Sequence, residues 1–171
     1  KAENAALVAI DPKTGQILVM VGSRNYFDTD IDGAFNIATA RRQPGSSFKP
    51  FIYETAFEKG YTPNTTVFDV PTEFSTACTP YGKPEPGRKK EDCYMPSNFD
   101  DKNRGPITLR SALQESINVP AVKMLYLVGV DEALRKARSL GVNMTGDKSQ
   151  YGLSLVLGGG EVSLLDLTSA Y

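Results

Sequence analysis

Two short apolar runs, residues 6–10 and 17–21, open the chain. The polar segment Asp11-Pro12-Lys13-Thr14-Gly15 lies between them, with proline early and glycine late, as tight turns require. Two apolar runs joined by such a turn predict a β-hairpin. The Asp-rich segment 23–33 that follows predicts a loop.

The pattern then changes to one that is typical of a helix. A break at Pro44-Gly45 allows a helix to begin at or near Ser46, and Gly60 ends it. Pro50 falls in the first turn, where the missing N–H of proline does no harm. We expect the residues at helical spacing to pack in the core rather than to bind a ligand: Phe48, Phe51, Ile52, Thr55 and Ala56.

Residues 61–106 have no regular period. Their prolines exclude long regular elements, so we expect an irregular Pro-rich excursion within a single domain, residues 1–171. A loop of this length is usually functional or mobile.

Beyond Pro106 the pattern is helical again. The expected boundaries are an N-cap at Thr108 for a helix through Gln114, a helix from Pro120 to near Gly129, an amphipathic helix capped by Asp131 and ended by Gly141, and a last helix begun by Ser163 with Asp166. The run Gly158-Gly159-Gly160 lacks the Lys-Ser/Thr ending of a phosphate loop, so it predicts close backbone packing.

Composition limits the function. A chain of 171 residues that is 40% hydrophobic can bury a core. The charges, 19 basic and 20 acidic, leave a net charge of −1, so we expect no nucleic-acid partner. No apolar run reaches the roughly 18 residues of a membrane span, and we read no signal peptide at the start.

The chain contains no histidine, which excludes Ser-His-Asp and Cys-His catalysis. Nucleophilic catalysis would therefore use lysine or a carboxylate. The two thiols, Cys78 and Cys93, have no zinc-type spacing, so we expect neither a metal nor a cofactor.

Ser46 and Lys49 are the strongest candidates for chemistry. Three positions apart on one helical face, their side chains can reach each other. A buried lysine with a lowered pKa could take the serine proton and make the hydroxyl a nucleophile. A lone S-x-x-K is nonetheless common by chance, and for the motif taken alone a capping serine followed by a solvated lysine is the favoured interpretation. The same holds for Ser116-Ile117-Asn118, which falls at an expected break between helices.

Longer segments carry a resemblance. They are 9–18 (AIDPKTGQIL), 35–39 (FNIAT), 42–50 (RQPGSSFKP), 105–113 (GPITLRSAL), 116–122 (SINVPAV) and 152–163 (GLSLVLGGGEVS). Together they closely resemble the transpeptidase domain of class A (bifunctional) penicillin-binding proteins. The resemblance covers nearly the whole chain and is weakest between residues 74 and 95.

This resemblance implies a fold and three motifs. We expect a mixed α/β (α+β) domain like that of penicillin-binding proteins and serine β-lactamases, with an antiparallel sheet flanked by helices and the Ser46 helix at its centre. The family motifs run in the order S-x-x-K, S-x-N, K-T-G. The Lys13-Thr14-Gly15 and Ser23-Arg24-Asn25 of this chain match the K-T-G and S-x-N patterns but precede Ser46. We therefore interpret neither of them as the catalytic motif. The catalytic K-T-G strand is expected beyond Tyr171, which would leave the fold incomplete at its C-terminal end and one sheet edge without strands.

The resemblance also implies roles for four residues. Ser46 would be the acylated nucleophile, Lys49 its base and Ser116 a proton relay, while Asn118 would bind the substrate peptide and hold the lysine. The implied reaction is D,D-transpeptidation of peptidoglycan stem peptides ending in D-Ala-D-Ala, with β-lactams as covalent inhibitors. We expect the chain alone to be inactive, because its C-terminal half, in the same or another chain, would carry the K-T-G strand.

Two alternatives to the transpeptidase stay open. One is a serine β-lactamase, which needs a carboxylate to activate water, and the other is a non-catalytic β-lactam-binding or sensor module. The family resemblance places the full-length protein on the extracytoplasmic face of a bacterial membrane, attached through an anchor outside this chain. In that location Cys78 and Cys93 are expected to form a disulfide, although two free thiols are the alternative. The basic run Arg88-Lys89-Lys90 is expected to be a solvated loop tip, with an anionic cell-wall polymer as a possible contact.

Overall fold

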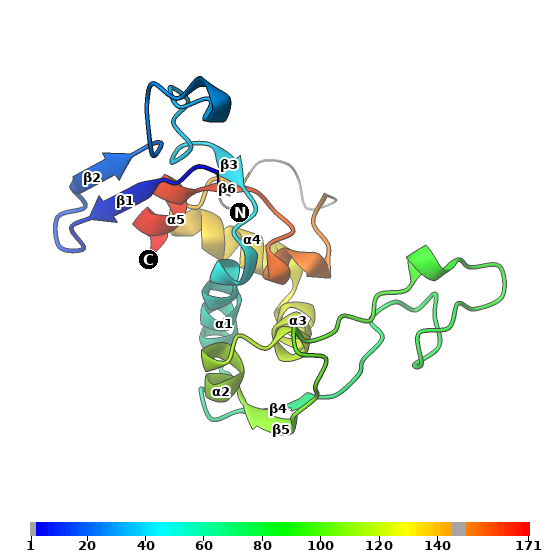
Figure 1. The fold of residues 1–171 in the computed structure, drawn as a ribbon. Helices are drawn as coiled ribbons and strands as arrows, with labels where there is room; N and C mark the ends of the chain where they lie inside the picture. Colours follow the sequence, from blue (N-terminus) through cyan, green and yellow to red (C-terminus); the bar gives the residue numbers. More distant parts are fainter. Residues whose placement is uncertain (1–2, 145–149) are drawn as a thin grey trace.

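A computed structural model describes residues 3–144 and 150–171 (Figure 1). The helices are α1 (Lys49–Glu58), α2 (Leu109–Gln114), α3 (Asn118–Val128), α4 (Val130–Ser139) and α5 (Leu164–Ala170). The strands are β1 (Leu7–Ile10), β2 (Ile17–Val21), β3 (Arg41–Arg42), β4 (Thr66–Asp69), β5 (Gly105–Thr108) and β6 (Val162–Ser163). Short 3₁₀ helices are η1 (Thr29–Ile31), η2 (Gly45–Phe48), η3 (Lys90–Asp92) and η5 (Leu153–Leu157).

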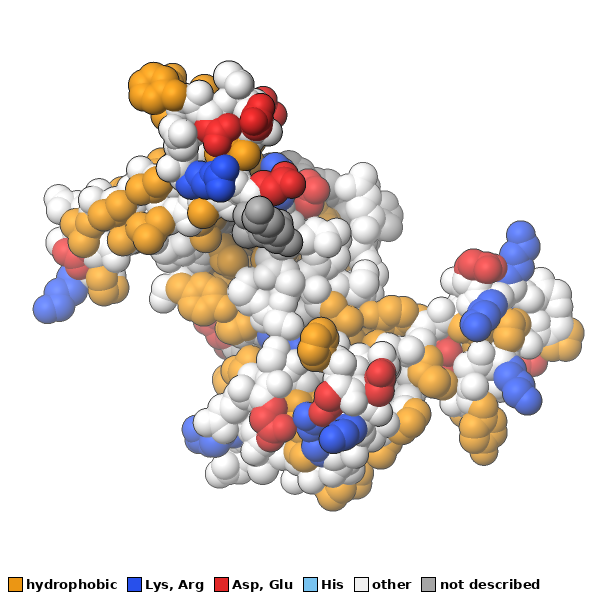
Figure 2. Space-filling model, viewed as in Figure 1, with side chains coloured by type: hydrophobic (Ala, Val, Ile, Leu, Met, Phe, Trp, Pro, Cys, Tyr) orange, Lys and Arg blue, Asp and Glu red, His pale blue; other side chains and the backbone are white. Residues whose placement is uncertain are grey.

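The mixed α/β class is confirmed, but the described strands form three separate antiparallel pairs in place of one sheet: β1 with β2, β3 with β6, and β4 with β5. The β1–β2 hairpin is the predicted one, with Leu7 opposite Val21. Gly15 has a φ of +73° in its turn, so Lys13-Thr14-Gly15 is part of a hairpin loop. Every residue of β2 is exposed, and Figure 2 shows apolar side chains along this arm.

Helix α1 occupies the centre of the core, as expected, and lies beside α3 (Figure 1). The core positions predicted for this segment are all buried. Phe48 of η2 and Ile52 and Ala56 of α1 have no exposed surface. Val122 and Leu125 of α3 are equally buried against it. Full burial of each large apolar side chain stabilises the fold by about 1.5–3 kcal/mol.

Most of the predicted helix boundaries are correct. Thr108 and Ser163 cap α2 and α5 by accepting hydrogen bonds from Ser111 and Asp166 backbone N–H groups. The prediction for Asp131 is wrong: it lies in the first turn of α4, while Gly129 is the N-cap residue. Gly129, with a φ of +91°, ends α3 and begins α4 directly, so no residue is left for a separate capping turn.

The Pro-rich segment projects away from the helices (Figure 1). It contains a strand that the sequence pattern does not predict, β4, which pairs with β5 at the base of the excursion. The predicted disulfide is confirmed: Cys78 and Cys93 are bonded, with their Cα atoms 5.5 Å apart.

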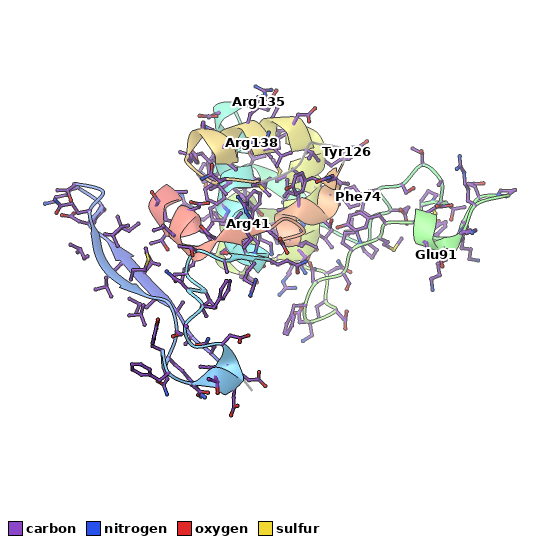
Figure 3. The ribbon with its side chains drawn as sticks, turned by 90° about the horizontal axis from the view of Figure 1, so that it is seen from above. Arg41, Phe74, Glu91, Tyr126, Arg135 and Arg138 are labelled. Carbon is purple, nitrogen blue, oxygen red and sulfur yellow. A yellow bond between two sulfur atoms is a disulfide. The ribbon has the colours of Figure 1, made fainter. Side chains whose placement is uncertain are left out.

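The excursion is attached to the helical core by aromatic rings. Phe74, a residue of the excursion, packs against Tyr126 of α3 with the ring centroids 5.7 Å apart (Figure 3). Tyr94, further along the excursion, packs against Phe74 with the ring centroids 6.2 Å apart. Such aromatic pairs add about 0.5–1.5 kcal/mol to the burial of their surfaces.

None of the described helices is long and apolar enough to cross a membrane.

Candidate active site

Ser46 lies in a 3₁₀ turn that leads directly into α1. Its backbone carbonyl accepts a hydrogen bond from the Lys49 N–H, and its side chain is exposed. The helix therefore begins where the sequence predicts, but as 3₁₀ helix before it becomes α-helix. Among the described residues the Ser46 hydroxyl forms no hydrogen bond, so the serine–lysine contact is not made in this conformation. Catalytic hydrogen bonds are often long or absent without substrate and tighten when it binds.

The glycine run packs against this turn. A Cβ atom on Gly158 would lie 2.3 Å from the backbone nitrogen of Gly45 and 2.5 Å from its Cα. Both glycines have positive φ, +91° and +59°. The predicted close backbone packing is confirmed, and it takes place immediately beside the candidate nucleophile.

Lys49 is completely buried, although it is a charged residue type. Its Nζ donates to the Ser116 carbonyl at 2.5 Å, to the Asn118 Oδ1 at 2.8 Å and to the Ser116 Oγ at 3.2 Å. The structure thus brings together three of the four predicted site residues, from the start of α1 and the junction between α2 and α3.

These three acceptors are all uncharged. Burial without a carboxylate partner disfavours the ammonium form and lowers the pKa of Lys49 from 10.5 to about 8. Near physiological pH a larger part of this amine is therefore neutral than in a solvated lysine, and the neutral form is the one that can accept a proton. The alternative of a solvated lysine is excluded by this burial.

Ser116 has a left-handed backbone conformation, with a φ of +54°. It follows α2, where the Ser116 N–H donates to Leu113 and the Ile117 N–H donates to Ala112. This is the Schellman pattern, and glycine is the usual residue at its left-handed position, which Ser116 occupies here. A serine in this left-handed conformation costs about 1–3 kcal/mol of backbone strain in the folded protein. The predicted break between helices is confirmed, and it turns both the carbonyl and the hydroxyl of Ser116 toward Lys49.

The Asn118 amide is held from both ends. Its Oδ1 accepts from Lys49, while its Nδ2 donates to the Ser97 carbonyl at 3.1 Å. Since a carbonyl accepts only, the amide nitrogen faces Ser97 and the oxygen faces the lysine. Sequence reasoning did not find Ser97, which lies in the Pro-rich segment without any periodic signal.

One group of potential metal ligands occurs among the described residues, namely Glu73, Cys78 and Cys93. Both sulfur atoms are committed to the disulfide, so they are not available to a metal.

Comparison with known proteins gives a consistent result. Residues 5–159 match the family model of the penicillin binding protein transpeptidase domain. The chain is 40% identical to penicillin-binding protein 1A of Aquifex aeolicus over 97% of its own length and 20% of that protein. It is 34% identical to penicillin-binding protein 1A of Rickettsia bellii over 98% of its length and 19% of that protein. The chain therefore spans about a fifth of the length of these relatives.

A solved structure of a related protein has the same fold. The crystal structure of penicillin-binding protein 1A from Haemophilus influenzae superimposes with a TM-score of 0.79 and 32% identity, over 98% of this chain and 23% of that one. The family match, the related sequences and the shared fold lead to one conclusion: the chain belongs to the penicillin-binding protein transpeptidase family.

Proposed function

We propose that this chain provides the serine and lysine part of a D,D-transpeptidase site that cross-links peptidoglycan through a serine acyl-enzyme. One observation carries the proposal: a buried lysine, surrounded by neutral acceptors, follows an exposed serine by one helical turn. The family membership supports the same reaction. The whole protein would use stem peptides that end in D-Ala-D-Ala.

In the first step Ser46 Oγ attacks the carbonyl carbon of the penultimate D-alanine while neutral Lys49 takes the hydroxyl proton. The Ser46 backbone N–H would be one donor to the oxyanion. When the tetrahedral intermediate collapses, the bond to the terminal D-alanine breaks and the leaving amine takes a proton. Ser116, 3.2 Å from the lysine Nζ, is placed to pass that proton on.

In the second step an amine of a neighbouring stem peptide attacks the ester, and its proton returns through the same groups. The new amide bond releases Ser46. A β-lactam would be attacked in the same way, but its leaving nitrogen stays tethered after ring opening, so the acyl-enzyme persists. Asn118 would bind the substrate peptide in addition to holding Lys49.

We further propose that the site is completed by residues outside the chain. Lys13-Thr14-Gly15 lies in the β1–β2 turn and cannot serve as the family's K-T-G strand. That strand would supply the second oxyanion donor, and loss of one such donor typically lowers the rate about 100- to 1000-fold. The chain alone is then expected to be inactive.

For the whole protein we propose the extracytoplasmic face of a bacterial membrane as its location. There the stem peptides and β-lactams are accessible, and a structural disulfide such as Cys78–Cys93 is stable.

The direct test is covalent labelling with a fluorescent penicillin, read by intact mass. We expect an adduct in the full-length protein, no adduct with Ser46→Ala, and none with the chain of 171 residues alone. Full-rate labelling of the isolated chain would contradict its proposed incompleteness.

Rapid release of the opened penicillin would favour the β-lactamase alternative. A stable adduct without any transfer to an amine would favour a sensor module. No labelling of either form would refute the serine mechanism.

A further inference from the structure

The start of helix α3, which carries Asn118, is capped by a residue from a distant part of the chain. Ile117, the N-cap residue, has no side chain that can accept a hydrogen bond from the first turn. Instead Asn98 Oδ1 accepts from the backbone N–H groups of Asn118 and Val119, at 3.1 and 3.0 Å. Both N–H groups belong to the first turn of the helix, where they have no internal partner.

The other end of the Asn98 amide is fixed as firmly. Asn98 Nδ2 donates to both carboxylate oxygens of Asp69, at 2.9 and 3.0 Å, and to the Lys102 carbonyl at 2.7 Å. Asn98 is only 4% exposed, so its polar atoms depend on these partners rather than on water.

Asp69 is a completely buried carboxylate at the end of β4. Besides Asn98, it accepts hydrogen bonds from the Arg104 backbone N–H at 2.8 Å and from Asn103 Nδ2 at 3.3 Å. A buried carboxylate with several donors is expensive to displace, because moving it away from them would leave its charge without compensation. Asp69 is therefore a rigid anchor for the Asn98 amide.

A continuous set of contacts thus runs from the base of the excursion to the candidate site. Asp69 orients Asn98, and Asn98 caps the backbone of Asn118. The neighbouring Ser97 carbonyl fixes the Asn118 side chain with its oxygen toward Lys49. We propose that Asp69 and Asn98 are positioning residues for the transpeptidase site, which hold Asn118 in register so that it can aim the Lys49 amine.

This proposal rests on the proposed function, but it makes a separate claim. A cap that served stability alone would change how much protein folds, but not how fast each folded site reacts. A positioning cap would change the rate at each folded site, since a misplacement of about 1 Å can cost about 100-fold in rate.

The main test compares two asparagine variants in the full-length protein. Asn98→Ala removes the cap, while Asn103→Ala removes an exposed amide that also contacts Asp69 but not α3. Penicillin labelling gives both the fraction of active sites and the acylation rate constant for each site. We expect Asn98→Ala to lower the rate constant about 10- to 100-fold and Asn103→Ala to stay within about twofold.

The pH dependence supplies a second reading. Without its anchor, the Asn118 oxygen no longer stabilises the ammonium form of Lys49, so the midpoint of the rate against pH should fall in Asn98→Ala. A reduced number of active sites with an unchanged rate constant and midpoint would overturn the proposal. If the unaltered protein takes no label, the proposed function fails instead.

A rescue experiment applies even if Asn98→Ala fails to fold. Asn98→Asp keeps the capping oxygen but places a second carboxylate against Asp69, so it should react slowly. Adding Asp69→Asn restores a donor opposite one carboxylate oxygen of the Asn98→Asp side chain, which still faces the Lys102 carbonyl. We therefore expect the second change to recover about tenfold of the lost rate but not all of it. If the two changes are simply additive, the Asp69–Asn98 contact has no positioning role.

Discussion

The helical core and the Pro-rich excursion contribute to the same site by different means. In the core, burial is apolar, and the packing of α1 against α3 removes Lys49 from water. In the excursion, hydrogen bonds of Asp69, Asn98 and Ser97 hold the polar groups in place. The core therefore lowers the pKa of the lysine, whereas the excursion orients the groups around it.

The largest expected effect comes from the core. Lys49→Arg keeps a positive charge but cannot give up its proton, so penicillin acylation should fall by about 10²- to 10⁴-fold. Lys59→Arg is the matched control, because Lys59 also donates to a backbone carbonyl, that of Val128, but far from the serine. Stopped-flow labelling of both variants measures the difference. An active Lys49→Arg protein would show that the lysine is not the base.

The next effect separates the outer part of the excursion from its base. Changing Cys78 and Cys93 together to serine opens a loop with a sequence separation of 15, and should lower the free energy of unfolding by about 3 kcal/mol. Thermal unfolding measures this loss. Since Ser97 and Asn98 lie outside the closed loop, the acylation rate of the folded protein should stay within about threefold. A much larger loss of rate would mean that the whole excursion orients the site.

A glycine pair tests the packing beneath Ser46, the proposed nucleophile. Gly158→Ala and Gly141→Ala both place a side chain at a φ of +91°, but only the first meets backbone atoms, those of Gly45. We expect Gly158→Ala to be less stable than Gly141→Ala by about 1–3 kcal/mol, and to slow acylation by moving Ser46. Equal unfolding free energies of the two variants in chemical denaturation would show that the Gly45 turn moves aside without loss of stability.

The smallest effect concerns the strained serine. Ser116→Gly relieves the left-handed strain and should be about 1 kcal/mol more stable than Ser116→Ala, which retains it. Both variants lack the hydroxyl and should acylate slowly. The unfolding free energies of the two variants give the strain directly, and equal values would argue against it.

The sequence was sufficient for the parts of the molecule that follow a local rule. Helical spacing identified the core side of α1, and capping residues located α2 and α5. The Pro-Gly break predicted where the Ser46 turn begins. Each of these depends on residues within a few positions of one another.

The parts that failed depend on distant partners. Strand β4 is paired with β5, almost forty positions away along the chain, and has no alternating pattern strong enough to predict it. The roles of Asp69 and Asn98 arise from contacts across the fold, at separations of 20 or more. Asp131 was misassigned because Gly129 serves two helices at once, which no capping rule anticipates.

The pH dependence of the acylation rate tests the central claim most directly. If buried Lys49 is the base, it must be neutral to take the Ser46 proton. The rate constant for penicillin acylation of the full-length protein should therefore rise with pH through a midpoint near the lysine pKa of about 8. A rate that does not change between pH 6 and 10, or that rises only near the ordinary lysine pKa of 10.5, would contradict the account.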